Sequence, residues 1–338
     1  MKPLKYLFIS SMLFVATSCG NSWLDLEPST SVDTETSIKI LSDVEFTLNG
    51  IYSTMQSSDA YSGRLVYYGD VTGDDMQAVS STKRVANYYR FNFTKDDNPS
   101  SHWSYLYSII QNCNLILMNI DKLVIDEDDK AYRDDLKGEA LAIRGLALFD
   151  LTRIFGYPYL KDDGASLGVP IIEGLSTIDS KPTRNTVAQC YTKIIDDLTQ
   201  SLSLLGEKFN KGKINKWGAM VLLSRVYLYK GENANALKMA SDAIIGAEKN
   251  KYALWTNEDY PTAWGEDASA SKPGEVLFEI VNLTTDSPGK ESMGYLNSYD
   301  GYDDMCITCS FYQFLKEDPK DIRLKLLSFD KKYYAYAT

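Results

Sequence analysis

The sequence predicts a mostly α-helical fold, made of TPR-like (tetratricopeptide-like) helix pairs and an irregular, loop-rich part. Apolar residues recur at helical spacing through residues 103–124, 130–155 and 186–248. Two of these stretches, 139–149 and 219–229, are rich in small residues and carry an arginine near the centre. Small residues let antiparallel helices approach closely, as stacked helix pairs do. The irregular spacing of the pairs predicts TPR-like packing rather than a regular solenoid.

The first element is an export signal at residues 1–18. Lys2 and Lys5 give it a basic start, and residues 6–15 form an apolar stretch too short to span a bilayer. Small residues follow directly before Cys19. This order is typical of a lipoprotein, in which the Cys19 thiol and the new amine are acylated and two or more acyl chains hold the protein on the membrane. The alternative is a plain signal peptide followed by an incidental cysteine.

The remaining elements follow in order along the chain. Residues 19–36 are polar and acidic and predict a flexible tether. No later segment has the uninterrupted apolar length of a transmembrane helix. The sequence predicts helices at 37–57, 103–124, 130–155, 186–206, 215–230 and 233–248, loops at 61–101, 157–185 and 253–310, a strand-like run at 275–283, and short helices at 311–316 and 322–327.

Composition excludes several classes of function. The chain of 338 residues has a formal net charge of −11, which argues against a nucleic-acid binder because phosphates need a basic face. His102 is the only histidine, so a multi-histidine metal site is excluded and a Ser/His/Asp triad has one possible base. Its place beside Trp103 at a helix start favours a structural or surface role over a catalytic one. No cofactor or metal is predicted.

Several stretches, in this order, resemble the SusD/RagB family of surface lipoproteins. No single stretch is specific, but their joint order across residues 19–230 is. The matching residues are Cys19 followed by Trp23 to Pro28, Tyr68 to Asp70, Trp103 to Ile110 with Asn114, Glu139, Ala140, Arg144, Phe149 to Leu151, Arg153, Phe155 to Gly156, Pro158, Arg184 with Asp197 and Leu198, and Ala219, Leu222 to Leu223 and Arg225 to Leu228.

The resemblance implies both a fold and a role. The fold is an α/α superhelix of TPR-like pairs with an irregular ligand-binding part. The role is non-catalytic capture of oligosaccharide, or of peptide in RagB-like members, at the outside of the outer membrane. The implied partner is a SusC-like TonB-dependent barrel, to which the lipoprotein delivers its ligand. A lipid-anchored glycoside hydrolase and a TPR-like protein-binding scaffold stay open as alternatives.

The resemblance also implies a domain organisation. Residues 37–250 form the N-terminal helical domain, and residues 251–338 form the start of the C-terminal region. Family members run well beyond this length through a region that packs back on the helices. We therefore expect this chain to lack part of that C-terminal region.

Sugar rings have flat C–H faces rimmed by hydroxyls, which proteins meet with exposed aromatic rings and neighbouring amide, carboxylate or guanidinium groups. The 24 tyrosines outnumber the 12 phenylalanines and 5 tryptophans combined, and two loops gather such residues. For any single aromatic, partial burial as scaffold is the alternative. The candidate ligand residues are Asn87, Tyr88, Tyr89 and Arg90 in one loop, and Trp255, Tyr260, Trp264, Tyr295, Tyr299 and Tyr302 in the other.

The remaining cysteines and acidic runs predict no chemistry of their own. Cys306 and Cys309 form a CxxC without a βαβ context, so we interpret them as a structural pair, either a local disulfide or two independent thiols. Cys113 and Cys190 lie on predicted core faces and read as buried apolar residues. The Asp clusters do not have EF-hand spacing and read as solvated loops. No spacing picks out a carboxylate pair for glycoside hydrolysis.

Overall fold

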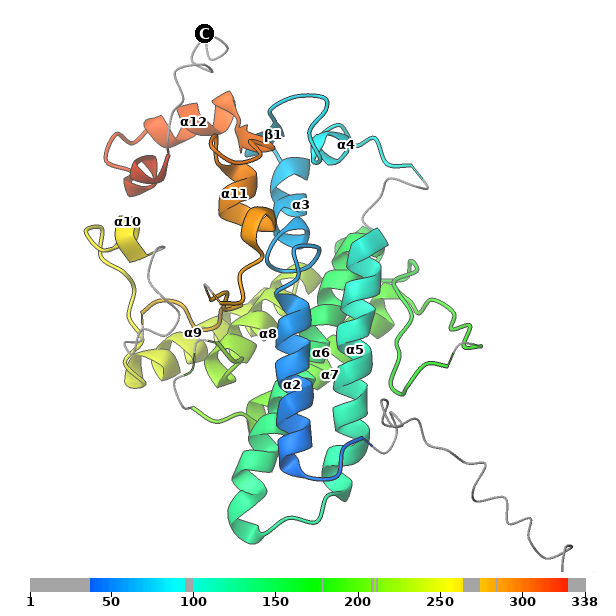
Figure 1. Cartoon of the computed structure of the whole chain (residues 1–338). Helices are drawn as coiled ribbons and strands as arrows, with labels where there is room; N and C mark the ends of the chain where they lie inside the picture. Colours follow the sequence, from blue (N-terminus) through cyan, green and yellow to red (C-terminus); the bar gives the residue numbers. More distant parts are fainter. Residues whose placement is uncertain are drawn as a thin grey trace, which may run out of the picture. The chain divides into compact units, whose positions relative to one another are not determined.

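Consecutive long helices pack against each other in chain order (Figure 1). The computed structural model describes residues 37–94, 100–177, 179–207, 210, 212–263, 274–283 and 285–327. The chain divides into two units, Met1–Lys39 and Ile40–Thr338, and the described helices and strands belong to the second. In that unit α2 (Leu41–Met55) packs on α5 (Ser100–Asn119), α5 on α6 (Lys130–Phe155), α6 on α7 (Val187–Leu204), α7 on α8 (Lys216–Lys230), and α8 on α9 (Asn233–Lys249).

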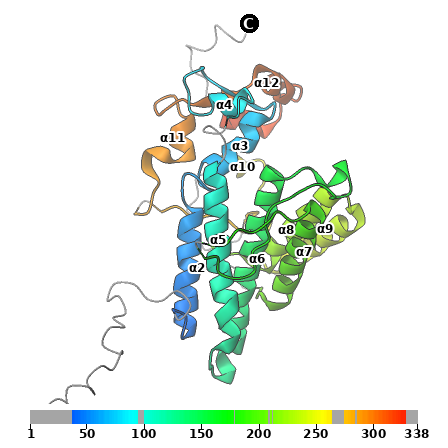
Figure 2. The ribbon, with the colours of Figure 1, turned by 90° about the vertical axis from the view of Figure 1, so that its right-hand side faces the viewer.

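The six long helices confirm the predicted helical stretches. Helix α6, Lys130–Phe155, has the same bounds as the helix predicted at 130–155. Figure 2 shows α7, α8 and α9 side by side. Among the described residues no helix is long and apolar enough to cross a membrane.

Small residues bring neighbouring helices together, as predicted. A Cβ added at Gly138 would lie 2.9 Å from Leu205, and one added at Gly145 would lie 3.0 Å from Leu198. The earlier glycine of α6 meets the later end of α7, so these two helices are antiparallel. Ordinary side chains at these positions would force the helices apart, because interiors are packed to crystal density.

Local sequence signals set the helix ends. Thr186 caps α7 through a capping box, since its hydroxyl accepts from the Gln189 amide and the Gln189 side chain accepts from the Thr186 amide. Asn215 caps α8 by accepting from two backbone amides of the first turn. Gly231 ends α8 at φ 85°, a left-handed conformation that favours glycine.

The core lies along the inner faces of these helices. Its largest fully buried side chains come from α2, α5, α6 and α7 and from the 3-10 helix η3 (Ile120–Lys122) that follows α5. They are Leu48, Ile51, Met55, Leu106, Ile109, Ile116, Ile120, Leu136, Ile143, Phe149, Leu151 and Ile194.

The predicted loop at 61–101 is partly wrong, because it contains helix α3 (Arg64–Thr72). Three glycines between residues 63 and 73 hide the helical period, yet Tyr67 and Val71 are both buried on one face. The other short elements include β1 (Met76–Ala78), α4 (Ala86–Tyr89), α10 (Tyr260–Ala263), α11 (Met293–Asn297), β2 (Met305–Ile307), α12 (Cys309–Lys316) and the 3-10 helix η7 (Ile322–Leu326).

The strand-like run at 275–283 forms no strand in the structure, and it bends at Glu275 and at Leu277. Side chains of the helices bind its carbonyls instead. The Gln56 amide donates to the Val281 carbonyl, and the Asn215 amide donates to the Leu277 carbonyl at 2.7 Å. The apolar pattern therefore reflects packing on the helices rather than sheet pairing. The predicted division of the chain at residue 250 stays a prediction.

Candidate functional site

The first predicted ligand loop and the later part of the second meet in one small lobe. We call residues 64–94 with residues 285–316 the tyrosine lobe. Strands β1 and β2 join the two segments as an antiparallel pair, with Met76 opposite Ile307 and Ala78 opposite Met305. The pairing brings residues more than 200 positions apart in the sequence into one structure.

Part of the predicted aromatic set forms the lobe's own core. Tyr88 is 9% exposed and packs with Tyr67, Leu296 and Met305. Its ring meets Tyr68 edge-on with centroids 5.4 Å apart. Burial raises the pKa of Tyr67 to about 12. Tyr88 therefore stabilises the lobe from inside. For this residue the structure favours burial as scaffold, the alternative to ligand contact.

Arg84 holds a second pair of tyrosines in the lobe, Tyr295 and Tyr302, in place. The Arg84 guanidinium lies 4.0 Å from the centroid of the Tyr302 ring, a cation–π contact, and Arg84 pairs with Glu291 at 2.7 Å. Tyr302 in turn meets Tyr295 edge-on at 5.1 Å. Burial raises the pKa of Asp304, although Arg84 at 3.7 Å opposes that shift. Tyr295 and Tyr302 are half-buried and held in fixed orientations.

Other aromatic rings of the lobe are exposed to solvent. Tyr299 is 53% exposed and Tyr89 is 38% exposed, while Arg90 is exposed and Asn87 half-buried. Phe91 is 64% exposed, has φ 54°, and meets Phe93 edge-on at 6.2 Å. A bulky residue in the left-handed region is a genuine outlier, and such outliers concentrate at functional sites. Sequence reasoning missed both phenylalanines, although they directly follow the predicted run.

The other predicted aromatics lie outside the lobe. Trp255 meets Tyr260, the first residue of helix α10, edge-on with centroids 6.1 Å apart. The Trp255 backbone amide donates to the Glu275 carboxylate at 3.0 Å. Helix α10 packs on η7. Trp264 and the predicted acylation site Cys19 lie outside the described residues.

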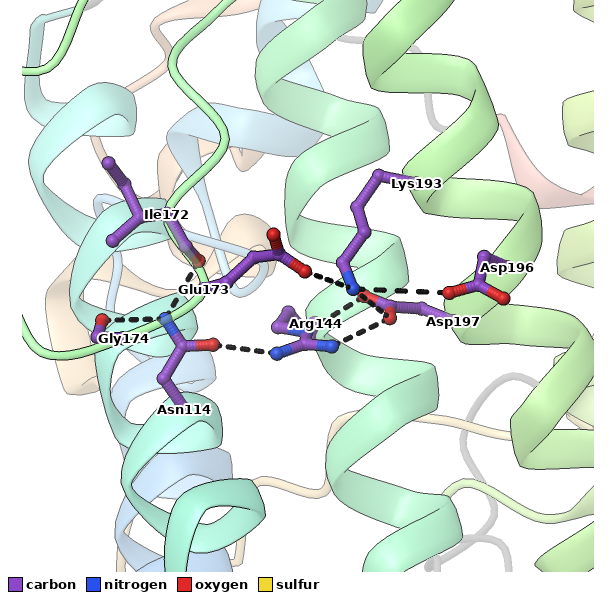
Figure 3. Close-up of polar contacts among 8 residues, drawn as sticks. All are labelled: Asn114, Arg144, Ile172, Glu173, Gly174, Lys193, Asp196 and Asp197. Carbon is purple, nitrogen blue, oxygen red and sulfur yellow. Dashed lines mark hydrogen bonds and ion pairs between the residues drawn. The ribbon is translucent and has the colours of Figure 1, made fainter.

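A buried polar network joins α5, α6 and α7 (Figure 3). Arg144 donates from Nε and Nη2 to the two oxygens of Asp197, at 2.8 and 2.7 Å. Its Nη1 donates to Asn114 Oδ1 at 2.8 Å. The Asn114 amide then donates to the carbonyls of Ile172 and Gly174. The network satisfies every charge it buries, so we assign it to structure rather than to chemistry.

Lys193 adds further ion pairs at the edge of the network. Lys193 lies 3.2 Å from Asp197 and 2.9 Å from Glu173, and the Lys193 ammonium lowers the pKa of Glu173. Glu173 belongs to the same loop that Asn114 holds. The core of the helical stack is thereby connected to the loop after α6.

The four described cysteines and His102 have structural rather than catalytic surroundings. Cys113 and Cys190 are buried as predicted, and burial raises the pKa of the Cys113 thiol to about 12. Cys306 and Cys309 are free thiols, not a disulfide. His102 is buried and donates from Nδ1 to the Asp59 carbonyl, and burial lowers its pKa. Within the described ranges no group of three or more His, Cys, Asp or Glu side chains could hold a metal ion.

Comparisons with known proteins give one consistent result. A family model described as "Starch-binding associating with outer membrane" matches residues 22–228. A curated relative, "SusD-like protein P2" of Formosa agariphila, is 28% identical over 311 residues, which are 89% of this chain and 57% of that protein. The chain thus spans little more than half of that relative.

Solved structures agree. A putative sugar-binding protein of Bacteroides vulgatus is 82% identical with a TM-score of 0.86, over 88% of this chain and 67% of that one. A SusD superfamily protein of Bacteroides thetaiotaomicron is 36% identical with a TM-score of 0.80, over 89% and 68%. A laminarin-binding SusD-like protein, 20% identical with a TM-score of 0.68 over 89% and 68%, shares the fold. With its family model matched over more than half its length, the chain belongs to the SusD-like family.

Proposed function

We propose that the protein is a non-catalytic lipoprotein that binds oligosaccharides at the cell surface. The observation that carries the proposal is the construction of the tyrosine lobe. Buried Tyr67 and Tyr88 fix the lobe, and exposed Tyr89, Phe91 and Tyr299 offer rings to solvent. An exposed aromatic ring is the ordinary partner for the C–H face of a sugar. The sugar-binding and laminarin-binding descriptions of the similar structures support the same ligand class.

Binding without cleavage is the direct test. The whole chain is incubated with maltohexaose, laminarihexaose and xylohexaose. Calorimetry measures affinity, and chromatography of the sugars measures cleavage. We expect affinity for at least one sugar and intact oligosaccharide after prolonged incubation. Released sugar would instead identify a lipid-anchored hydrolase. If no sugar or peptide binds, a protein-binding scaffold becomes the better description.

The membrane anchor is a separate part of the proposal. Acylation of Cys19 would place the chain on the outer membrane, facing outward. We expect radiolabelled palmitate in the wild-type chain and none in Cys19→Ala. Protease added to intact cells should degrade the wild-type protein. Protection of the protein until the cells are lysed would place it on the inner side.

The partner is the final part of the proposal. We propose that the lipoprotein delivers its ligand to a SusC-like TonB-dependent barrel. The barrel should co-purify with the lipoprotein after mild detergent extraction. Deleting either protein should abolish growth on the glycan that calorimetry identifies. Unchanged growth without the barrel would remove the delivery step but leave glycan binding intact.

A further inference from the structure

A groove that the sequence did not predict runs between helix α5 and the loop after α6. Its volume is about 300 Å³, at the lower end of the range for small-ligand pockets. Five of its eight lining residues come from α5 and three from the loop. They are Trp103, Ser104, Tyr107, Ser108 and Gln111, with Ile172, Ser176 and Pro182.

The loop wall of the groove is held in place by one face of α5. Tyr107, Gln111 and Asn114 are spaced four and three residues apart, which puts them on the same helix face. The Tyr107 hydroxyl donates to the Pro170 carbonyl at 2.7 Å. Gln111 donates to the Ser176 hydroxyl at 2.9 Å and accepts from its backbone amide at 2.8 Å.

Asn114 completes this attachment by donating to two carbonyls of the loop, at 2.8 and 3.0 Å. Backbone groups from residue 170 to residue 176 are therefore fixed by three side chains. A wall that is already ordered loses little conformational entropy when a ligand binds, so the groove is preorganised.

The floor of the groove is a pair of braced aromatic rings. The Trp103 and Tyr107 centroids lie 4.9 Å apart, and the Phe155 ring supports Trp103 edge-on at 5.0 Å. Both floor rings are only half-buried. The exposed Ser104 and Ser108 stand beside them on the same helix.

The lining chemistry selects a neutral ligand with many hydroxyls. None of the eight lining residues is charged. Flat rings match the C–H face of a pyranose, and serine hydroxyls together with the Gln111 amide match its rim. An anion would find no cation in this lining, and the net charge of −11 disfavours it further.

We propose that this groove is a second carbohydrate site, in which one neutral pyranose unit stacks on Trp103 and is contacted from the side by the Tyr107 ring, which is tilted by 50° to Trp103. The inference rests on the proposed glycan-binding function and adds a subsite outside the tyrosine lobe. An oligosaccharide long enough to occupy both subsites at once binds more tightly than one that occupies a single subsite.

A tryptophan-specific signal tests the groove directly. The whole chain is labelled with 5-fluorotryptophan, and the Trp103 resonance is identified by its loss in Trp103→Phe. The same three hexasaccharides are titrated while calorimetry records total affinity. We expect the Trp103 resonance to move with the sugar that binds, and to reach the same shift at saturating sugar in Tyr299→Ala, whose lobe is impaired.

A blocking variant and its matched control complete the test. Ser108→Phe places a ring in the groove from an exposed position of α5, whereas Ser203→Phe changes an exposed serine of α7. We expect Ser108→Phe to abolish the Trp103 shift and to weaken hexasaccharide binding about a hundredfold or more, because the gain from two linked subsites is lost. Ser203→Phe should leave both unchanged.

The possible failures are distinguishable. If calorimetry detects binding while the Trp103 resonance stays still, the groove is not a sugar site and the proposed function stands. If none of the three sugars binds, the proposed function fails and the groove assignment fails with it. If Ser108→Phe leaves sugar binding intact but abolishes co-purification of the barrel, the groove is a protein contact and the proposal is overturned.

Discussion

Replacing Asp197 by alanine should be among the most destabilising single changes in this protein. Asp197 is fully buried and Arg144 is 7% exposed. Without the carboxylate, the guanidinium keeps a single neutral acceptor, Asn114 Oδ1. Leaving one buried charge without its partner costs about 3–5 kcal/mol. Lys193 keeps its pair with Glu173 at 2.9 Å, so it adds little to the loss.

A double variant separates the cost of an orphaned charge from the worth of the pair. Arg144→Met combined with Asp197→Leu removes both charges and fills the space with apolar atoms. The Asn114 oxygen then lacks its donor, which costs about 1–3 kcal/mol. We expect the double variant to be more stable than Asp197→Ala alone.

Urea unfolding followed by circular dichroism measures these differences, since the midpoint scales with stability. Asp242→Ala is the matched control, because Asp242 forms an exposed pair with Lys238 on α9. Such pairs contribute about 0.5 kcal/mol or less. If Asp197→Ala costs no more than Asp242→Ala, or if the double variant is the least stable of the set, the reasoning is refuted.

Three further predictions concern pH, packing and ligand binding. Burial raises the pKa of Glu139 to about 7, so the folded state binds a proton that the unfolded state releases near pH 4.5, and stability falls as pH rises between those values. Glu139→Gln should lack this loss, which reaches about 3 kcal/mol. If the melting temperature falls by the same amount between pH 5 and pH 8 in the wild-type protein and in Glu139→Gln, the prediction is wrong. Gly145→Ala should lower the free energy of unfolding by about 1–3 kcal/mol, because the added Cβ would lie 3.0 Å from Leu198. Gly50→Ala, with open space around it in α2, should raise the free energy of unfolding by about 0.5–1 kcal/mol. If chemical unfolding finds Gly145→Ala more stable than Gly50→Ala, the packing argument is refuted. Tyr299→Ala should weaken glycan binding in calorimetry with an unchanged melting temperature, and unchanged affinity would remove Tyr299 from the ligand surface.

Local signals predicted the helices well, and tertiary pairing explains what they missed. An acidic run precedes helix α6, and Gly156 and Pro158 follow it, so local residues predict both of its ends. Helix α3 was missed because its glycines break the apolar period, although Tyr67 and Val71 are buried by the rest of the lobe. Burial by a segment distant in sequence leaves no local trace.

The same reason limited the prediction of ligand residues. The sequence indicated two aromatic loops, and the tyrosine lobe contains the first of them and the part of the second that carries Tyr295, Tyr299 and Tyr302. It could not distinguish buried Tyr88 from exposed Tyr89, because only the partner segment around Leu296 decides which ring is covered. The groove was missed because Trp103 and Tyr107 read as helix residues until the loop at 170–176 is placed beside them.

The buried network connects core stability to the wall of that groove. Arginine only donates hydrogen bonds, so the Asn114 oxygen must face Arg144 and its amide nitrogen must face the loop carbonyls. Asp197 orients Arg144, which orients Asn114, which holds Ile172 in the groove wall. Loss of Asp197 should therefore loosen the groove as well as the helices, and amide hydrogen exchange of residues 171–176 should accelerate in Asp197→Ala but not in Asp242→Ala. Protection that stays equal in the two variants would mean that Tyr107 and Gln111 hold the wall without help from the core.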